Sequence, residues 1–436
     1  MTILRGHAML CGIDAPGNSH MLDTDVLIVG AGPVGLLSAL ALVQKGVGVT
    51  VIEADARLND SPRAAIYFPS TLCALQELGV LEDLERRGFR NARLGHHVPG
   101  LGFRALMTLE VLRGITFDYM VHAGQDVVDE VALEHARRRG ARVLFEHCLT
   151  GLEQDAGGAT ARIATPAGER VLRASWVIGA DGARSTVRHL LGVDFEGHTW
   201  ANRFVATNVY CDFPAAGYEP ANFICDPVYS GVVALLDREG LWRLTYQEDA
   251  ALPVETFMER LPERYAHFIP AGMHYQIKAA RPYTIHQRCA ARLRVGRVCL
   301  AGDAAHATNP LGGLGLTTGV WTGLILSDLL GAVIGGEAEA AILDRFSQER
   351  RRVFWEVTSP GATENKRMAE EKDLEQRRRD LATVQAAADN PEIARLMMAF
   401  PFKVIGDPLR ENSRWRGFDP TAPAGIDLSA RRSQVG

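Results

Sequence analysis

The sequence predicts an α/β fold, with a Rossmann-like dinucleotide-binding domain, an inserted antiparallel-sheet domain and a helical C-terminal region. Three observations carry this prediction. A short buried strand runs into a turn and then a helix or loop at three places, near residues 30, 181 and 303. Alternating strand patterns fill residues 204–246 between the second and third places. After residue 323 the pattern is helical.

Composition excludes several classes of protein. Of 436 residues, 47% are hydrophobic and 23% charged, which is ordinary for a globular protein with enough chain for two domains. The formal net charge of −5 offers no basic field for nucleic acid. Seven cysteines without a CxxC pair argue for a reducing, cytoplasmic compartment and against a disulfide framework or a metal site. Glycines and a proline break the apolar run 26–43, so no membrane span is predicted.

The elements before residue 200 follow from local signals. Residues 1–22 lack an apolar signal core and are expected to form a flexible extension. Helix 125–139 carries its apolar residues on one face and stops at Gly140. The full set is the strand 25–29, the helix 33–45, the strand 49–52, the helices 69–78, 81–87 and 125–139, the strand 142–146, the meander 150–173 and the strand 176–180.

The first of the three places has the spacing of a dinucleotide site. Gly30 permits a tight turn, Gly32 lets a pyrophosphate approach the backbone, and Gly35 allows the helix to pack closely on the strand. Glu53 ends the next strand, where it can accept hydrogen bonds from a ribose. A coincidental tight turn is the alternative. Arg63, on the loop that follows, either meets a phosphate or is a solvated loop charge.

The second and third places each put a carboxylate directly after a strand. Asp181 follows strand 176–180, and an ordinary strand-to-helix turn would also explain it. Asp303 follows strand 298–300 and precedes a glycine-rich stretch, 312–319, that enters a helix. Glycines let a backbone lie flat against a large ligand, and a helix start offers unpaired N–H groups. A tight connection without a ligand remains the alternative there.

The remaining elements define the insertion and the C-terminal region. A hairpin turn at 237–240 joins two of the inserted strands. Arginine runs in the C-terminal helices are interpreted as solvated faces. The expected elements are the strands 204–212, 221–225, 231–236 and 241–246, the helix 254–264, a returning strand 283–289, the helices 324–334, 337–357, 363–387 and 393–400, and irregular chain from 407.

Together the three places carry a family resemblance. Residues 30–35 read GAGPVG, residues 181–188 fit D-G-x-x-S-x-x-R, and residues 302–315 fit G-D-A-A-H-x-x-x-P-x-G-G-x-G. The sequence resembles the single-component FAD-dependent aromatic hydroxylases, the para-hydroxybenzoate hydroxylase-like flavoprotein monooxygenases, over about residues 24–357. The resemblance implies the division into a flexible extension at 1–22, an FAD-binding domain at 23–90, 121–200 and 283–345, a substrate-binding sheet domain at 91–120 and 201–282, and a helical C-terminal region with a tail at 346–436.

The resemblance also implies how FAD is held. Glu53 and the first glycines would hold the adenosine diphosphate part, Asp303 the ribityl or pyrophosphate region, and the start of the last glycine-rich helix the flavin ring. Residues 181–184 would also touch NADH or NADPH in passing. The implied cofactor-binding set is Gly30, Gly32, Pro33, Gly35, Glu53, Arg63, Gln125, Asp181, Gly182, Arg184, Asp303, Pro310, Gly313, Gly315, Leu316 and Thr317.

Three departures from the family pattern stand near the flavin. Thr317 replaces a common Asn, Thr322-Gly323 replaces Asp-Ala, and Leu314 replaces a common Gln. The backbone of these residues can still contact the flavin, whereas the family's side-chain contacts to flavin do not carry over to them. The thioredoxin-like C-terminal domain of the larger phenol hydroxylases is not expected here, since roughly 80 residues follow the shared core.

The implied reaction is hydroxylation of an aromatic small molecule. NAD(P)H would reduce the flavin, O2 would give a flavin hydroperoxide, and an electron-rich ring would attack it. Candidate catalytic residues are Pro310, Tyr210, Tyr229 and His286. Candidate substrate-binding residues are Phe223, Val233, Leu235 and Tyr246. Each tyrosine and histidine has a structural hydrogen-bonding role as its alternative, the apolar residues have a plain core as theirs, and His306 is interpreted as structural.

Two alternative functions share this fold. A flavin-dependent halogenase would carry Trp-x-Trp-x-Ile-Pro, which is missing here. An FAD-dependent oxidase or reductase would lack the oxygen transfer to a ring. The sequence does not distinguish NADH from NADPH or identify the aromatic substrate, and it is compatible with a homodimer.

Overall fold

A computed structural model describes residues 23–421, and the predicted extension 1–22 and the end of the predicted tail lie outside them. The first sheet has eight strands in the order β17-β18-β11-β1-β2-β8, with β10 and β9 added beside β11. Its strands are β1 (Thr24–Val29), β2 (Val49–Ile52), β8 (Arg142–Leu144), β9 (Cys148–Asp155), β10 (Gly158–Thr165), β11 (Gly168–Gly179), β17 (Arg294–Val295) and β18 (Val298–Leu300). The strands β18, β11, β1, β2 and β8 run parallel, as a Rossmann-like sheet requires.

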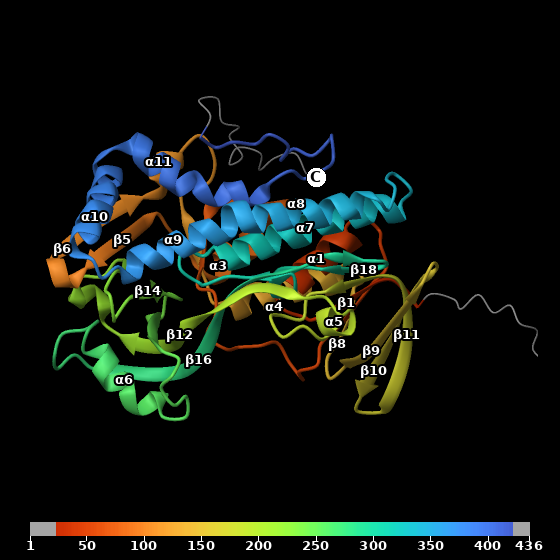
Figure 1. Ribbon diagram of the computed structural model, residues 1–436, viewed down its shortest axis with the longest axis horizontal. Coiled ribbons are helices and arrows are strands. Elements are labelled where there is room, and N and C mark those ends of the chain that lie inside the picture. The colour runs from red at the N-terminus through yellow and green to blue at the C-terminus, as the bar shows by residue number, and fades with distance from the viewer. Residues whose placement is uncertain (1–22, 422–436) are drawn as a thin grey trace, which may run out of the picture.

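Three helices cover the first sheet: α1 (Pro33–Val43), α4 (Gln125–Arg138) and α7 (Leu314–Ile334). In Figure 1 α7 lies alongside α1, with β18 and β1 beneath them. The contact between α1 and α7 is close because small residues face it. A Cβ at Gly319 would come within 3.1 Å of Val34, and one at Gly323 within 2.6 Å of the Ser38 hydroxyl. The glycine at 323, a departure from the family pattern, therefore permits this helix crossing.

The second sheet is antiparallel except at one strand pair and also has eight strands. Its order is β19-β16-β12-β15-β14-β13-β5-β6, and β5 joins β13 in parallel. Its strands are β5 (Arg93–Val98), β6 (Phe103–Thr108), β12 (Phe195–Cys211), β13 (Ala221–Ile224), β14 (Gly231–Leu235), β15 (Leu241–Asp249), β16 (Tyr275–Ala290) and β19 (His306–Ala307). The predicted domain boundaries at 200 and 283 fall inside β12 and β16, and the division into domains stays a prediction.

Smaller elements connect the two sheets. A three-stranded sheet contains β3 (Ile66–Tyr67), β7 (Met120–His122) and β4 (Phe89–Asn91). The helices around it are α2 (Pro69–Glu77) and α3 (Leu81–Arg87), while α5 (Thr186–Leu190) follows β11 and α6 (Phe257–Tyr265) packs on the second sheet. Short 3-10 turns lie at Pro99–Leu101, Leu109–Leu112, Phe213–Ala216, Gly302–Ala304 and Phe400–Ile405.

The C-terminal helices differ from the predicted boundaries. They are α8 (Ile342–Val353), a π-helical turn (Phe354–Thr358), α9 (Ser359–Glu370), α10 (Leu374–Asp389) and α11 (Pro391–Ala399). The predicted single helix 363–387 is wrong, because α9 ends at Glu370 and Asp373 caps α10 by accepting from the Gln376 N–H at 2.7 Å. The predicted start at residue 324 is also wrong, since α7 begins at Leu314.

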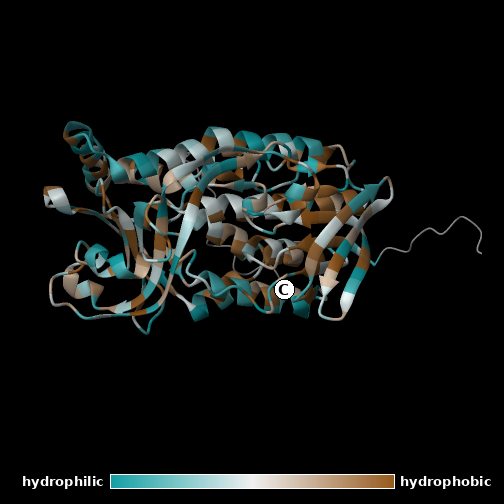
Figure 2. Cartoon of the chain, turned by 60° about the horizontal axis from the view of Figure 1, so that its bottom comes forward, coloured by the Kyte–Doolittle hydropathy of each residue, from teal (hydrophilic) through white to brown (hydrophobic). Residues whose placement is uncertain are grey.

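Apolar residues gather in the central helices and strands, and polar residues cover the outer helices (Figure 2). Among residues 23–421, α7 is the helix that is long and apolar enough to cross a membrane by length and composition. Its apolar window is 72% buried inside the structure, as in a core helix. It runs from the glycine-rich stretch into the interior, so it holds that stretch rigidly against the first sheet.

Candidate active site

The turn between β1 and α1 leaves room on its outer side only. A Cβ at Gly30, whose φ is +106°, would lie 2.5 Å from the Ala180 carbonyl oxygen, and one at Gly35 would lie 2.0 Å from the Gly30 oxygen. A Cβ at Gly32, directly before α1, would meet nothing within 4 Å. The first and third glycines are therefore required by packing. The second leaves open space at the start of a helix, where a phosphate can approach the N–H groups.

Glu53 closes this turn from the end of β2. Its carboxylate accepts from the Ala31 N–H at 2.8 Å and from the Asp55 N–H at 3.0 Å. These bonds fix the carboxylate beside the turn that begins α1. Pro33 is the first residue of α1, where its missing N–H costs nothing.

Asp181 organises the second place. One of its oxygens accepts from the Ser185 hydroxyl at 2.6 Å and the other from the Val187 N–H at 3.0 Å, and burial raises the pKa of its carboxyl. Gly182 adjoins it, and Arg184 is exposed. The Asp181 carboxylate is thus occupied by the start of α5, and Arg184 is left free to meet a ligand from outside.

Arg188 joins the second place to the third. It is buried, and its guanidinium donates to the Ala304 carbonyl at 3.0 Å and the Ala183 carbonyl at 2.7 Å. The same group lies 3.9 Å from the centre of the Phe195 ring. Arg188 is therefore not a solvated helical arginine. Arg188 holds two loops together that are far apart in the chain.

Asp303 lies in the 3-10 turn after β18. Its side chain is open to solvent, yet it sits deep among protein atoms, so that burial raises the pKa of its carboxyl. The charge of Arg63 opposes this shift from the loop after β2. Gln125, at the start of α4, binds the buried carboxyl of Asp129, whose pKa burial also raises. Arg63 is within electrostatic reach of both Asp303 and Asp129, so the loop after β2, the turn after β18 and the start of α4 lie near one another. We name these three segments the converging loops.

The start of α7 presents backbone and hides side chains. Gly313 precedes the helix with a φ of +67°, which only glycine adopts readily. The Thr317 hydroxyl donates to the Gly313 carbonyl at 2.9 Å and bonds the Thr71 hydroxyl at 3.0 Å. Gly315 and Leu316 are half-buried in the first turn, where N–H groups have no partner within the helix. The Thr317 side chain faces the protein, so a ligand would meet this turn through its backbone.

The loop before α7 is held by a buried polar network that the sequence analysis missed. Gln287 accepts from the Asn309 N–H at 3.2 Å and donates to the Ser359 hydroxyl at 2.9 Å, and Asn309 donates to the Ala362 carbonyl at 2.9 Å. The Pro310 carbonyl accepts from the Gly313 N–H at 3.1 Å. An asparagine before a proline was the available signal, but its partner on β16 cannot be found from local sequence.

The second sheet has two faces with different neighbours. Residues directly opposite in antiparallel strands share a face. The inner face carries Phe204, Phe223, Arg243 and Tyr283, and Leu311 of the glycine-rich loop packs into its cluster. The other, which we name the α6 face, packs on α6. The inner face therefore packs against the glycine-rich loop and against the C-terminal helices α9 and α10.

The predicted substrate residues divide between these faces. Phe223 is on the inner face, and its pair partner is Val232. Val233, Leu235 and Tyr246 belong to the cluster on the α6 face. The Tyr246 hydroxyl is buried with no hydrogen-bond partner among residues 23–421. Of the four, only Phe223 therefore lies on the inner face, where it packs among apolar residues of β5, β6, α10 and α11.

The other predicted catalytic side chains also lie apart from one another. Tyr210 is 38% exposed on β12, and the Tyr229 ring stacks on His267. His286 bonds the Thr199 hydroxyl at 3.0 Å, and burial together with nearby arginines lowers its pKa. Alternation along β16 turns His286 to the face opposite Gln287, which holds the glycine-rich loop. Pro310 is the predicted catalytic residue that lies beside the converging loops.

The departure at Thr322 has a structural counterpart. Its hydroxyl bonds His306 at 2.9 Å and accepts from Arg350 at 3.2 Å. Arg350 is completely buried and also donates to the carbonyls of Ile405 and Val404. His306 stacks on Phe354 of the π-helical turn, and burial lowers its pKa to about 3. These contacts tie α7 to the C-terminal segment.

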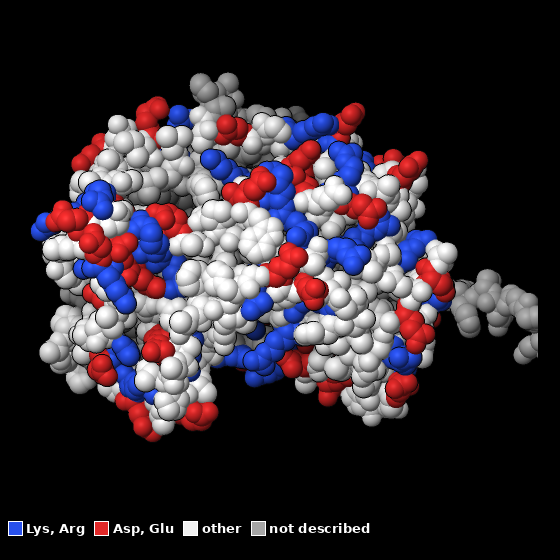
Figure 3. All heavy atoms as spheres, viewed as in Figure 1, with Lys and Arg blue, Asp and Glu red and all other residues white. Residues whose placement is uncertain are grey.

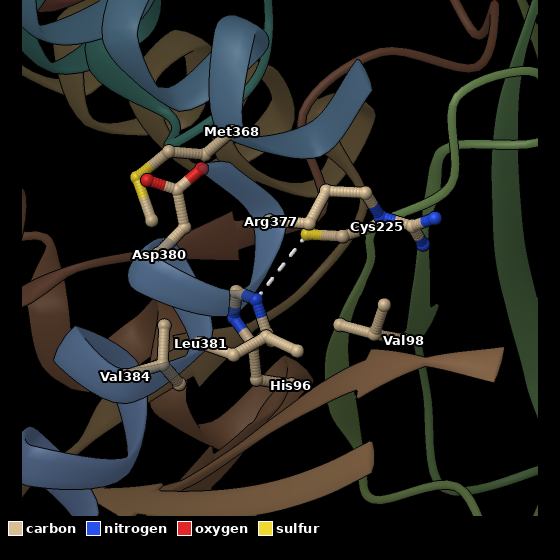
Figure 4. A pocket seen from close by; sticks show the side chains of 8 residues that line it. All are labelled: His96, Val98, Cys225, Met368, Arg377, Asp380, Leu381 and Val384. Carbon is tan, nitrogen blue, oxygen red and sulfur yellow. Dashed lines mark hydrogen bonds between the residues drawn. The ribbon is translucent and has the colours of Figure 1, made fainter. Parts of the chain in front are cut away.

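A narrow cavity lies between the second sheet and the C-terminal helices. Figure 4 shows the contact within it, where His96 and Cys225 lie 3.2 Å apart. It is lined by His96, Val98, Cys225, Met368, Arg377, Asp380, Leu381 and Val384. On the outer surface, acidic and basic side chains are mixed, with Lys and Arg gathered at the hollow below the centre of Figure 3.

Comparisons with known proteins agree with this arrangement. Residues 23–360 match the FAD binding domain family. The chain is 43% identical over 375 residues to para-nitrophenol 4-monooxygenase of Pseudomonas sp. (strain WBC-3), covering 85% of this chain and 93% of that protein. It is 38% identical over 347 residues to 6-hydroxy-3-succinoylpyridine 3-monooxygenase of Pseudomonas putida (strain DSM 28022 / S16), covering 78% and 88%.

Solved structures show the same fold. The crystal structure of p-nitrophenol 4-monooxygenase from Pseudomonas putida DLL-E4 superposes with a TM-score of 0.85 at 42% identity, covering 88% of this chain and 98% of that chain. A ternary complex of aklavinone-11 hydroxylase with FAD and aklavinone gives a TM-score of 0.72 at 30% identity, covering 80% and 70%. The predicted fold class is confirmed by these matches.

Proposed function

The chain belongs to the FAD-binding flavoprotein monooxygenases, and from this premise we propose that it hydroxylates a small para-substituted phenol at the carbon that bears the substituent. It is an FAD-dependent aromatic monooxygenase that uses NAD(P)H and O2, as its relatives are. The finer statement, which ring and which carbon, is the proposal.

The names of two relatives carry this proposal. In para-nitrophenol, carbon 4 bears the nitro group opposite the hydroxyl group, and the relative is named a 4-monooxygenase. In 6-hydroxy-3-succinoylpyridine, carbon 3 bears the succinoyl group opposite the hydroxyl group, and the relative is named a 3-monooxygenase. Both names put oxygen on the substituted ring carbon opposite the hydroxyl group. We infer the same reaction here, because each alignment covers most of both chains.

The residues at the converging loops fit FAD. Open space beside Gly32 suits the pyrophosphate, and the exposed guanidinium of Arg63 and the accessible carboxyl of Asp303 suit the polar ribityl chain. The backbone of the first turn of α7 suits the electron-rich edge of the ring system. In this proposal Glu53, Gln125 and Arg184 complete the contacts. FAD, when bound, accepts hydride from NAD(P)H and activates O2.

The protein's own part is to place the ring and to keep water out. The inner face supplies Phe204, Phe223 and Ile285 as an apolar wall, and Leu311 packs against it from the glycine-rich loop. The network of Gln287 and Asn309 holds that loop, so Pro310 stays in place beside the ring. We propose that Tyr246, Val233 and Leu235 support this wall from the α6 face.

Coupled product formation tests the proposal. With 4-nitrophenol, oxygen added at carbon 4 displaces the nitro group, so nitrite should appear in step with NAD(P)H consumption. 3-Nitrophenol, which has no substituent opposite its hydroxyl group, is the control and should release no nitrite. Consumption of NAD(P)H with peroxide as the sole product would contradict the proposal. We place this activity in the cytoplasm, on a free small molecule, with the enzyme as a monomer or homodimer.

A further inference from the structure

The inner face of the second sheet carries a buried arginine without an acidic partner. Arg243, on β15, is 4% exposed. Its Nε donates to the Asn208 side-chain oxygen at 2.8 Å, and its Nη1 donates to the Arg63 carbonyl. Among residues 23–421 no carboxylate lies within ion-pair distance of it, and its Nη2 has no hydrogen-bond partner.

The same sheet shows how a buried arginine is ordinarily balanced. Arg203, on β12, is 7% exposed and pairs with the buried carboxylate of Glu248 at 2.7 Å. A buried guanidinium is costly unless each of its nitrogens has an acceptor, and Arg243 has acceptors at Nε and Nη1 only. Burial lowers the pKa of Arg243 to about 10, still well above neutrality, so the group remains a cation. Arg243 is therefore a fixed positive charge with a free donor.

The surroundings of Arg243 suit an aromatic ring. On its own sheet Asn208 and Ala234 are its direct neighbours, and the apolar inner face with Phe204 and Ile285 continues from there toward Leu311. Tyr283 lies within electrostatic reach, since the charges of Arg243 and Arg63 oppose the raising of its pKa by burial. A cation at the edge of an aromatic and apolar wall matches a ring that carries one negative oxygen.

We propose that Arg243 binds the phenolate oxygen of the substrate, and so selects ionised phenols. This rests on the function proposed above. Asn208 and the Arg63 carbonyl fix two nitrogens of the guanidinium, which leaves Nη2 as the donor for the ligand. A phenolate ring is richer in electrons at the carbon opposite its oxygen than the neutral phenol is. Binding the anion therefore also prepares that carbon for oxygen transfer.

Other ionisable groups act on this position from every side. Tyr67 and Asp126 act on Arg243 from β3 and α4, and Tyr283 acts from β16. Asp129, also on α4, is within reach of Tyr67, and Arg63 is within reach of Asp303. Burial raises the pKa of Tyr67 and of Tyr283, so both are neutral near pH 7. Arg281, opposite Ala206 on the same face, is exposed and donates to the Ser61 hydroxyl. Arg243, Arg63 and Arg281 are thus the cations of the cluster, and Asp126 is the exposed acid at its rim.

Binding to the oxidised holoenzyme without nicotinamide tests the assignment. 4-Nitrophenol reports its own ionisation by the yellow colour of its phenolate, and 4-nitroanisole is a neutral ring of nearly the same shape. In the wild type, bound 4-nitrophenol should ionise at lower pH than the free compound. It should also bind more tightly than the ether, by about 10-fold to 100-fold for a charge-assisted hydrogen bond.

Three variants separate charge from structure. Arg243→Met should remove the ionisation shift and the preference for the phenol, while 4-nitroanisole binds as before. Arg243→Lys keeps the charge and should retain part of the shift, which guards against a folding defect in the Met variant. Arg203→Met is the matched control on the α6 face, and should lower the melting temperature while leaving the spectrum of bound nitrophenol unchanged.

Two results would overturn the assignment. The first is that 4-nitrophenol bound to Arg243→Met ionises at the same lowered pH as in the wild type. The second is that the wild type binds 4-nitrophenol and 4-nitroanisole with equal affinity. Failure of the proposed function is seen separately. If the enzyme binds the phenolate through Arg243 but releases no nitrite when NAD(P)H is added, the assignment of Arg243 stands and the proposed reaction is contradicted.

Discussion

Arg350 shows how single buried residues hold this protein together. Its three nitrogen groups each have an acceptor, at Thr322, Ile405 and Val404. Burial lowers its pKa to about 10, so the cation is retained and is stabilised by carbonyl dipoles instead of a carboxylate. Thr322 stands where the family pattern has Asp, and the C-terminal segment supplies the missing acceptors.

We expect Arg350→Met to lower the free energy of unfolding by about 3 kcal/mol, because it leaves buried carbonyls unpaired. Urea titration measures this. Arg352→Met, two residues further on α8, is the control: Arg352 is half-exposed and paired with Glu349 and Glu356, and its loss should cost less than about 1 kcal/mol. Equal losses of unfolding free energy in the two variants would show that the buried contacts of Arg350 do not stabilise the fold more than a surface ion pair does.

His122 is a buried residue whose protonation opposes folding. One ring nitrogen bonds the Leu235 carbonyl at 2.7 Å, and the other faces the Asn91 amide at 3.2 Å. A neutral ring satisfies both, as donor to the carbonyl and acceptor from the amide. Burial lowers the pKa of His122 from 6.5 to about 4. Between these values the unfolded chain binds a proton that the folded protein does not.

Stability should therefore be complete above pH 6.5 and fall as pH drops toward 4, by on the order of 3 kcal/mol for this residue. His96 and His306, both buried with lowered pKa, act in the same direction. Urea titrations at a series of pH values should show a shallower loss for His122→Gln. An identical pH dependence in variant and wild type would refute the role of His122.

At the scale of elements, different glycines of the β1–α1 turn serve folding and cofactor binding. Gly35→Ala would place a Cβ 2.0 Å from the Gly30 carbonyl oxygen, so we expect a loss of about 3 kcal/mol in unfolding free energy. Gly32→Ala meets nothing within 4 Å and should fold normally, yet hold FAD at least about 10-fold more weakly because the Cβ enters the pyrophosphate position. Apoprotein melting and FAD titration measure the two effects. If Gly32→Ala bound FAD with wild-type affinity, the pyrophosphate would not bind at this turn.

Elements with strong local signals were predictable. The β1–α1–β2 unit and helix α3 follow the sequence closely, because glycines, a proline and apolar periodicity mark their ends. The break at Glu371 was not predictable, since its cause is a cap at Asp373 inside a continuous helical pattern. The start of α7 was placed too late because its first turns are rich in glycine and threonine, which are weak helix formers.

The sequence could not show which face of the second sheet each side chain occupies, and the reason is physical. Side chains alternate along a strand, so one extra residue reverses every later assignment. Irregularities interrupt the pairing of β12 with β16 at two points, between Thr199 and Arg203 and between Asn208 and Val209. Val233 and Tyr246 are apolar or aromatic side chains that would be buried on either face, so their residue types do not indicate which face they occupy. Arg243 was missed because a charged residue in a strand is expected to face solvent, whereas here it is buried and donates to the Arg63 carbonyl of the loop after β2.

At the scale of the whole molecule, two sheets divide the work. The first sheet supplies the turns after β1, β2 and β18 that suit FAD, and Arg243 of the second sheet donates to the Arg63 carbonyl in one of them. Arg188, which bonds the Ala304 carbonyl and lies over the Phe195 ring of β12, and the pairing of β16 with β19 join these parts, so the cofactor loops and the substrate wall hold one geometry. The central claim is that oxygen from O2 reaches the substituted carbon of a ring held between them.

Reaction of the FAD-loaded protein with 4-nitrophenol, NAD(P)H and ¹⁸O-labelled O2 measures this most directly. The product is trapped by chemical reduction as the hydroquinone and analysed by mass spectrometry. We predict one labelled oxygen in the ring product and an equal amount of nitrite. A product without label, or labelled peroxide alone, would contradict the account.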